Sequence, residues 1–287
     1  MKQYPSYKRI KESGFYRSSF AVFIRKCVAH RVGRWGAALA YYFLLSFFPL
    51  VLFISLLFSI LSGSADITRL FSNRVVPSEV IDTAASVLEH GSGLGRETLM
   101  VSGALMSLYG GSRAVGCLRE AINRSYGLRE KRSFFLLIVI DFGFSALFLS
   151  ASVVTFAFII LTPDAPYYIG GIFTGIRPYL RFSFVFLIFF GLLTVLYSAV
   201  PDSFISFRQA VPGALAAASG WTAGSMAFSL YVGNMGNYSI LYGSIGAVIV
   251  LMLWLYFTGT VLVIGAEFNN FAAHFITRRR QRRKAGK

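Results

Sequence analysis

Five ionisable residues lie within or at the ends of strongly apolar stretches: Arg113, Glu120, Arg124, Asp141 and Glu267. Arginine binds phosphate and carboxylate groups through paired, charge-assisted hydrogen bonds. We therefore predict a substrate-binding site for an anionic group, in which Arg113 and Arg124 contact the anion while Glu120, Asp141 and Glu267 balance the charge. The alternative is that these residues form salt bridges that fix neighbouring helices.

The spacing of three of these residues places them on the same face of one predicted helix. Arg113, Cys117, Glu120 and Arg124 recur every three or four residues, which places them on one face of a helix. Asp141 and Glu267 belong to other apolar stretches, close to the ends expected on the same side of the membrane. We expect the five ionisable residues to line a polar cavity that opens to the cytoplasm.

The sequence holds no pattern typical of catalysis or metal binding. The three histidines, His30, His90 and His274, are far apart, and there is no HExxH, GxSxG or phosphate-binding loop. Neither Cys27 nor Cys117 has a CxxC neighbour, and both are expected on the reducing side of the membrane. We therefore predict no catalytic residue, no cofactor and no metal.

The elements that position these residues are predicted to be transmembrane helices. Hydrophobic residues make up 55% of the 287 residues and charged residues only 14%, so one soluble core could not bury the apolar surface. A bilayer span needs about 20 mostly apolar residues. Six stretches are predicted to be spans: 36–62, 98–118, 134–161, 180–200, 210–232 and 242–268. The second is diluted by glycine and serine. The predicted fold class is all-α, a polytopic membrane protein with a bundle of six transmembrane helices.

Basic residues are distributed unevenly between the two sides of this bundle. Of the 28 Lys and Arg residues, 23 fall on the side that holds both termini and 5 fall in the opposite loops. Positive residues are enriched in cytoplasmic loops, so we predict a cell-membrane protein with both termini in the cytoplasm. The basic run 278–284 fits anionic lipid at the cytoplasmic face, and we expect no nucleic-acid partner because no aromatic residues interleave it.

Shorter segments complete the predicted organisation. Apolar residues recur with helical period at 20–28 and 80–88, which predicts short amphipathic helices at the two membrane surfaces. The chain thus divides into a basic N-terminal segment (1–35), a transmembrane domain (36–270) and a basic tail (271–287).

Small residues form one face of the fifth predicted span, at Gly213, Ala217, Gly220 and Gly224. Such a face permits close helix contact. We expect it to pack inside the bundle, and the alternative is a contact between subunits of a homo-oligomer.

Several motifs resemble those of the YihY/BrkB membrane proteins, once labelled ribonuclease BN. The resemblance covers residues 20–273 and is carried by AALAYYFLLSFFPL (37–50), AINRSYG (121–127), VPGA (211–214), YGSIGAVI (242–249), LWLY (253–256) and GAEFN (265–269). It implies an integral protein of the cytoplasmic membrane with six helices, and it implies little about chemistry.

Three functions follow from these observations. The leading hypothesis is non-enzymatic translocation or binding of an anionic, lipid-like amphiphile or a small anionic solute. The first alternative is a membrane-bound hydrolase or ribonuclease, as the old family label suggests. The second is an envelope scaffold that recruits partner proteins.

Overall fold

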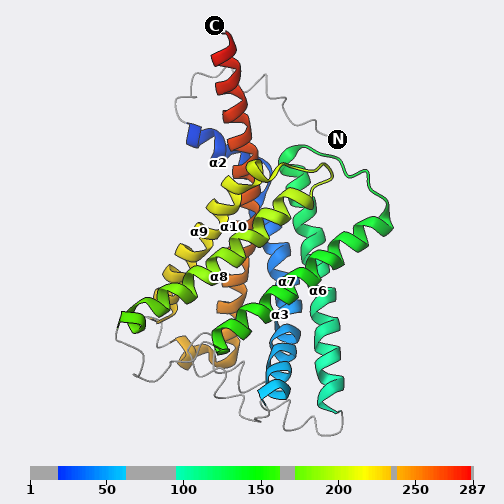
Figure 1. Ribbon diagram of the computed structural model, residues 1–287, viewed down its shortest axis with the longest axis vertical. Helices are drawn as coiled ribbons and strands as arrows, with labels where there is room; N and C mark the ends of the chain where they lie inside the picture. Colours follow the sequence, from blue (N-terminus) through cyan, green and yellow to red (C-terminus); the bar gives the residue numbers. More distant parts are fainter. Residues whose placement is uncertain (1–18, 63–94, 162–171, 234–237, 286–287) are drawn as a thin grey trace.

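The computed structural model describes residues 19–62, 95–161, 172–233 and 238–285, and α-helix is the only regular secondary structure in these ranges (Figure 1). The predicted all-α class is confirmed. The predicted helix at 80–88 lies outside the described residues. In chain order the helices are α2 (Ser19–Ala29), α3 (Val32–Ser62), α6 (Arg96–Tyr126), α7 (Phe134–Leu161), α8 (Ile172–Ala199), α9 (Phe207–Gly233) and α10 (Tyr238–Ala285).

Four of the helices are long and apolar enough to cross a membrane. The qualifying segments are Val32–Leu57 in α3, Phe134–Phe158 in α7, Phe182–Ala199 in α8 and Val248–Ala273 in α10. Helices α6 and α9 have sufficient length, with 31 and 27 residues, but glycine, serine and charged residues make them less apolar. The described residues are compatible with the predicted six spans, and that count stays a prediction.

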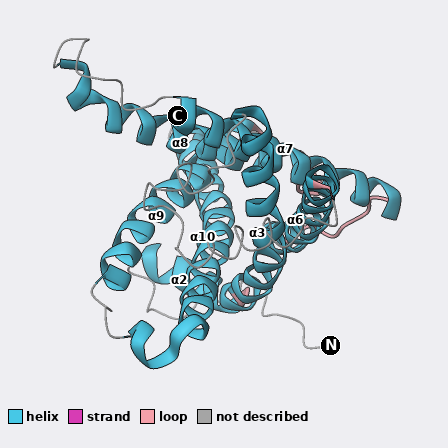
Figure 2. Ribbon diagram, turned by 90° about the horizontal axis from the view of Figure 1, so that it is seen from below, coloured by secondary structure: helices cyan, strands magenta, loops and turns pink. Residues whose placement is uncertain are grey.

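The helices form two groups of three that meet along α10. Consecutive helices pack together within each group: α3 on α6 and α6 on α7 in the first, and α8 on α9 and α9 on α10 in the second. The groups are joined because α10 packs against α3 and α6, whereas α7 and α8 contact each other sparsely. Both α7 and α8 cross the same side of the bundle at a pronounced tilt, with α3, α6 and α10 behind them (Figures 1 and 2).

Glycine allows α3 and α6 to approach closely. A β-carbon at Gly110 of α6 would lie 3.0 Å from the backbone nitrogen of Ser46, and one at Gly103 would lie 3.0 Å from the carbonyl oxygen of Pro49. Real β-carbons are rarely this close to backbone atoms, so the contact requires glycine at both positions. Helix α6 also continues to Tyr126, beyond its predicted end at residue 118.

The small-residue face of α9 packs within the chain, as predicted. Gly213 lies directly against the Gly265 carbonyl of α10, and a β-carbon at Gly265 would contact Ala217 at 2.7 Å. The side chain of Asn269 accepts a hydrogen bond from the Gly213 N–H at 2.6 Å. Close backbone packing and one buried hydrogen bond therefore hold α9 against α10.

Helix α2 lies at the end of the bundle where α10 extends beyond the other helices (Figure 1). The turn between α2 and α3 has Arg31 in the left-handed region, with φ of 56°. Phe23 of α2 packs edge-on against Phe268 and Phe271 of α10, at ring-centroid distances of 5.9 and 5.8 Å. Helix α10 continues through most of the basic C-terminal segment and ends at Ala285.

Candidate functional site

Arg113 lies on an exposed face of α6, about 13 residues before the helix ends, which is roughly 20 Å along its axis. Its guanidinium carbon sits 5.4 Å from the centroid of the Tyr109 ring. The neighbouring Leu105, Met106 and Tyr109 are half or more exposed. A cation therefore stands within a strip of apolar and aromatic side chains on the outside of the bundle.

Glu120 and Arg124 are exposed on the same helix, while Cys117, which lies between Arg113 and Glu120, is buried. The helical face predicted from spacing thus turns outward over most of its length. The structure does not bring Arg113, Glu120 and Arg124 to one enclosed cavity with Asp141 and Glu267. Their role as substrate contacts stays a prediction.

Asp141 of α7 is held by an arginine that the sequence analysis did not select. The Nε and Nη2 atoms of Arg119 donate to the two carboxylate oxygens of Asp141 at 3.1 and 3.0 Å. This is the paired geometry that guanidinium and carboxylate groups favour. Gly116 brings the helices together here, since a β-carbon at that position would lie 2.8 Å from Asp141 Oδ2.

The same arginine begins a network that ties together the loops at this end of the bundle. Arg119 Nη1 donates to Glu130 at 2.9 Å, and Asn123 donates to the same carboxylate oxygen at 2.9 Å. Arg132 forms ion pairs with Glu130 and Asp202 at 3.1 and 3.5 Å. The Asp202 N–H in turn donates to Asn123 Oδ1 at 2.9 Å.

Asp202 illustrates the electrostatics of this network outside the spans. The Lys131 backbone N–H donates to its carboxylate at 3.1 Å, and this bond, together with side-chain contacts to Glu130 and Arg132, lowers the pKa of Asp202. The loop thus favours the charged carboxylate. Two arginines and three carboxylates make the network a structural clamp between α6, α7 and the α8–α9 loop.

Glu267 occupies a second polar centre, between α2 and α10. Its side chain is 1% exposed, and one carboxylate oxygen lies 2.5 Å from His30 Nδ1. Its Oε2 atom is buried without a hydrogen-bond partner. Burial and the nearby Glu267 charge raise the pKa of Cys27 on α2 to about 11. Glu267 therefore links the turn after α2 to α10, a contact across 237 residues that no local pattern could reveal.

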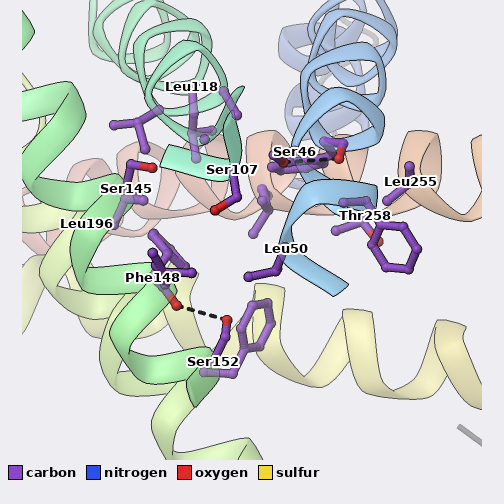
Figure 3. Close-up of a pocket in the computed structure, with 18 of the residues that line it drawn as sticks. Ser46, Leu50, Ser107, Leu118, Ser145, Phe148, Ser152, Leu196, Leu255 and Thr258 are labelled. Atoms are coloured by element: carbon purple, nitrogen blue, oxygen red, sulfur yellow. Dashed lines mark hydrogen bonds between the residues drawn. The ribbon is translucent and has the colours of Figure 1, made fainter. Parts of the chain in front are cut away.

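A mid-depth apolar cavity of about 260 Å³ is lined by residues near the middle of the helices, and its lining is drawn in Figure 3. Five helices line it, α3, α6, α7, α8 and α10, and these include all four apolar spans. Leu50, Leu118, Phe148 and Leu196 are among its walls, and Ser46, Ser107, Ser145, Ser152 and Thr258 supply its hydroxyl groups. The sequence did not predict this cavity, because its walls have the composition of ordinary spans.

No group of three or more His, Cys, Asp or Glu side chains that could hold a metal ion occurs among the described residues. The described polar centres are built from guanidinium, carboxylate, amide and imidazole groups that contact one another.

Comparisons with known proteins identify a family and several membrane-protein relatives. Residues 23–287 match the family described as virulence factor BrkB. The ribonuclease-like protein YfkH of Bacillus subtilis (strain 168) is 30% identical over 245 residues, which cover 82% of this chain and 87% of that protein. A UPF0761 membrane protein of Pseudoalteromonas translucida (strain TAC 125) is 26% identical over 254 residues, covering 85% and 82% of the two chains.

A further UPF0761 membrane protein, from Alteromonas mediterranea, is 26% identical over 261 residues, covering 88% of this chain and 86% of its own length. No solved structure matches the chain. The resemblance found in the motifs is confirmed over nearly the whole sequence. The chain is a multi-pass integral membrane protein that belongs to the BrkB family.

Proposed function

We propose that the protein binds and translocates an anionic amphiphile, with Arg113 as the principal contact for the anionic group. The observation that carries this proposal is the exposed position of Arg113 about 20 Å from the end of α6, among exposed apolar side chains. An arginine at the centre of a membrane helix costs roughly 2.5–3.5 kcal/mol on insertion scales. A phosphate group that pairs with the guanidinium offsets this cost.

The surroundings of Arg113 favour an amphiphile over a small hydrophilic anion. Leu105, Met106 and Tyr109 present an exposed apolar surface beside the guanidinium, and hydrocarbon chains would pack on such a surface. Arg124 lies on the same face of α6, about 16 Å farther along the axis. A phosphate group passing along α6 would therefore meet a second arginine near the end of the helix, with Glu120 between them.

The remaining predicted contacts have different supporting roles in this proposal. Asp141 and Glu267 are engaged by Arg119 and His30, so we assign them to holding the helices rather than to the substrate. We further propose that the protein lies in the cytoplasmic membrane with both termini inside, on the charge distribution alone. Anionic lipids would then surround the basic end of α10.

The experiment is reconstitution of the purified chain into phosphatidylcholine vesicles with a small fraction of fluorescent phosphatidylglycerol in both leaflets. Dithionite quenches the outer-leaflet dye, so protein that moves lipid makes the inner-leaflet dye accessible. A hydrogen bond to a charged group contributes about 1.5–3 kcal/mol, so we expect Arg113→Gln to slow this exchange by roughly 10- to 150-fold.

The matched control is Arg208→Gln, which removes an exposed arginine from the first turn of α9 and should leave the rate unchanged. Lysine keeps the charge at Arg113 but not the paired geometry, so Arg113→Lys should give an intermediate rate. If the wild-type protein moves no phosphatidylglycerol, or if both glutamine variants are equally impaired, the proposal is wrong.

The two other hypotheses lead to separate measurements. The word ribonuclease-like belongs to the name of the Bacillus relative, and cleavage of RNA by the purified chain would favour a hydrolase over a translocator. Stable co-purification of another envelope protein, with lipid exchange absent, would favour a scaffold.

A further inference from the structure

We propose that the mid-depth cavity is a binding site for the hydrocarbon chain of a bilayer lipid, which enters between α7 and α8. The inference goes beyond the proposed function, because it concerns a partly open internal site for the tail on the other side of α6 from Arg113. It requires neither an anionic headgroup nor translocation.

The chemistry of the walls selects hydrocarbon over any polar ligand. Four of the five hydroxyl groups donate to backbone carbonyls: Ser46 to Phe43, Ser107 to Ala104, Ser145 to Leu108 and Ser152 to Phe148, at 2.9 to 3.0 Å. The fifth, Thr258, accepts a hydrogen bond from the Trp221 indole at 3.1 Å. With these groups engaged, the cavity offers mainly leucine and phenylalanine side chains to an occupant.

The size of the cavity suits a chain segment. An apolar cavity of about 150 Å³ in a protein stays dry and accepts benzene, and this one measures about 260 Å³. Well-packed interiors contain few voids larger than a water molecule. All four apolar spans contribute to the walls, so the medium available to fill the space is the acyl region of the bilayer.

The entrance is assigned to the seam between α7 and α8. The seam is closed at one end by the stacked rings of Phe158 and Phe184, whose centroids are 3.9 Å apart. It is closed at the other end by Arg132, which donates to the Val200 carbonyl at 2.9 Å. Between these ties the two helices contact each other sparsely, and both line the partly open cavity.

The test uses the full-length protein in vesicles of phosphatidylcholine that carries a diazirine in the middle of one acyl chain. After illumination, mass spectrometry maps the adducts on the protein. We expect adducts at Val115 and Leu118, which line the cavity and are 5% and 4% exposed. Lipid on the outside of the bundle would reach exposed residues such as Val139 and Leu187 instead.

Two matched variants on α7 separate a filled cavity from a general disturbance. Ser152 lines the cavity and Ser150 is exposed, and each hydroxyl donates to the carbonyl four residues before it. Ser152→Phe should lower the Val115 and Leu118 adducts by about tenfold, since a filled site excludes the chain. Ser150→Phe should leave them unchanged.

Adducts confined to exposed positions in the wild-type protein would overturn the proposal without any variant, as would equal losses in the two phenylalanine variants. Arg113→Gln should retain the cavity adducts. Lipid exchange that fails while the adducts form would refute the proposed translocation alone, and exchange that occurs without cavity adducts would refute the tail site alone.

Discussion

Replacing Arg119 by alanine should destabilise the helical bundle more than replacing an exposed arginine by alanine. Its side chain is 12% exposed and that of Asp141 is 14% exposed, so the pair is largely removed from solvent. The substitution removes two hydrogen bonds to Asp141 and one to Glu130. Removing one partner of a buried ion pair costs roughly 3–5 kcal/mol, because the other charge stays buried and unpaired.

The structure favours the lower end of that range. Two charge-assisted bonds to Asp141, at about 1.5 kcal/mol each, account for about 3 kcal/mol. Glu130 loses less, since Arg132 and Asn123 still contact it at 3.1 and 2.9 Å. We therefore expect Arg119→Ala to reduce the free energy of unfolding by about 3 kcal/mol.

The assay is reversible unfolding in mixed micelles with increasing dodecyl sulfate, followed by circular dichroism. Arg129→Ala is the control, because this arginine is exposed in the adjoining loop and surface ion pairs contribute about 0–1 kcal/mol. A double-mutant cycle with Asp141→Ala isolates the pair, and contacting residues should show a coupling of at least about 1 kcal/mol. A coupling below about 0.5 kcal/mol, or equal losses in the Arg119 and Arg129 variants, would refute the reasoning.

Three further outcomes follow from the contacts. Gly213→Ile should destabilise the protein by about 1–3 kcal/mol in the same assay, because the isoleucine side chain would overlap the Gly265 carbonyl. An unchanged unfolding midpoint would contradict the close packing of α9 on α10. Asp202 has a lowered pKa when folded, so its stabilising contribution is complete above the ordinary aspartate pKa and is lost as the pH falls toward the lowered value. Asp202→Asn should remove the part of the loss of stability at acid pH that Asp202 causes. An unaltered profile of stability against pH would contradict this role of Asp202. His30→Ala should loosen α2, so that Cys27, whose pKa is raised to about 11, is alkylated faster at pH 8; an unchanged rate would show that α2 is held by other contacts.

The four apolar spans were predictable because each one is a continuous apolar run, and recognising such a run needs no knowledge of neighbouring helices. The partner of Asp141, Arg119, was not predictable from the sequence. Helical spacing grouped Arg113 with Glu120 and Arg124, and they do share an exposed face, but spacing does not say which face of a helix meets its neighbour. Arg119 faces α7 because Gly116, three residues before it, lets the two helices close.

Glu267 shows a different limit of sequence reasoning. Its apolar surroundings singled it out, yet its partner His30 lies in the N-terminal segment, where a lone histidine carries no recognisable signal. The cavity left no signal either. Its residues are typical of lipid-facing spans, and the sequence does not say which of them meet inside the bundle.

The polar clamp and the cavity are linked through the register of α7. Arg119 of α6 binds Asp141 of α7. One helical turn after Asp141, Ser145 lines the cavity and donates a hydrogen bond to the Leu108 carbonyl of α6. Both contacts hold α7 against α6, so they oppose the movement of α7 toward α8. A lipid chain that enters between α7 and α8 must displace one of these two helices, and α8 lacks a comparable tie to α6 among the described residues. Opening of the seam is therefore expected to move α8, whose end at Ala199 leads directly into the Asp202 loop that Arg132 anchors.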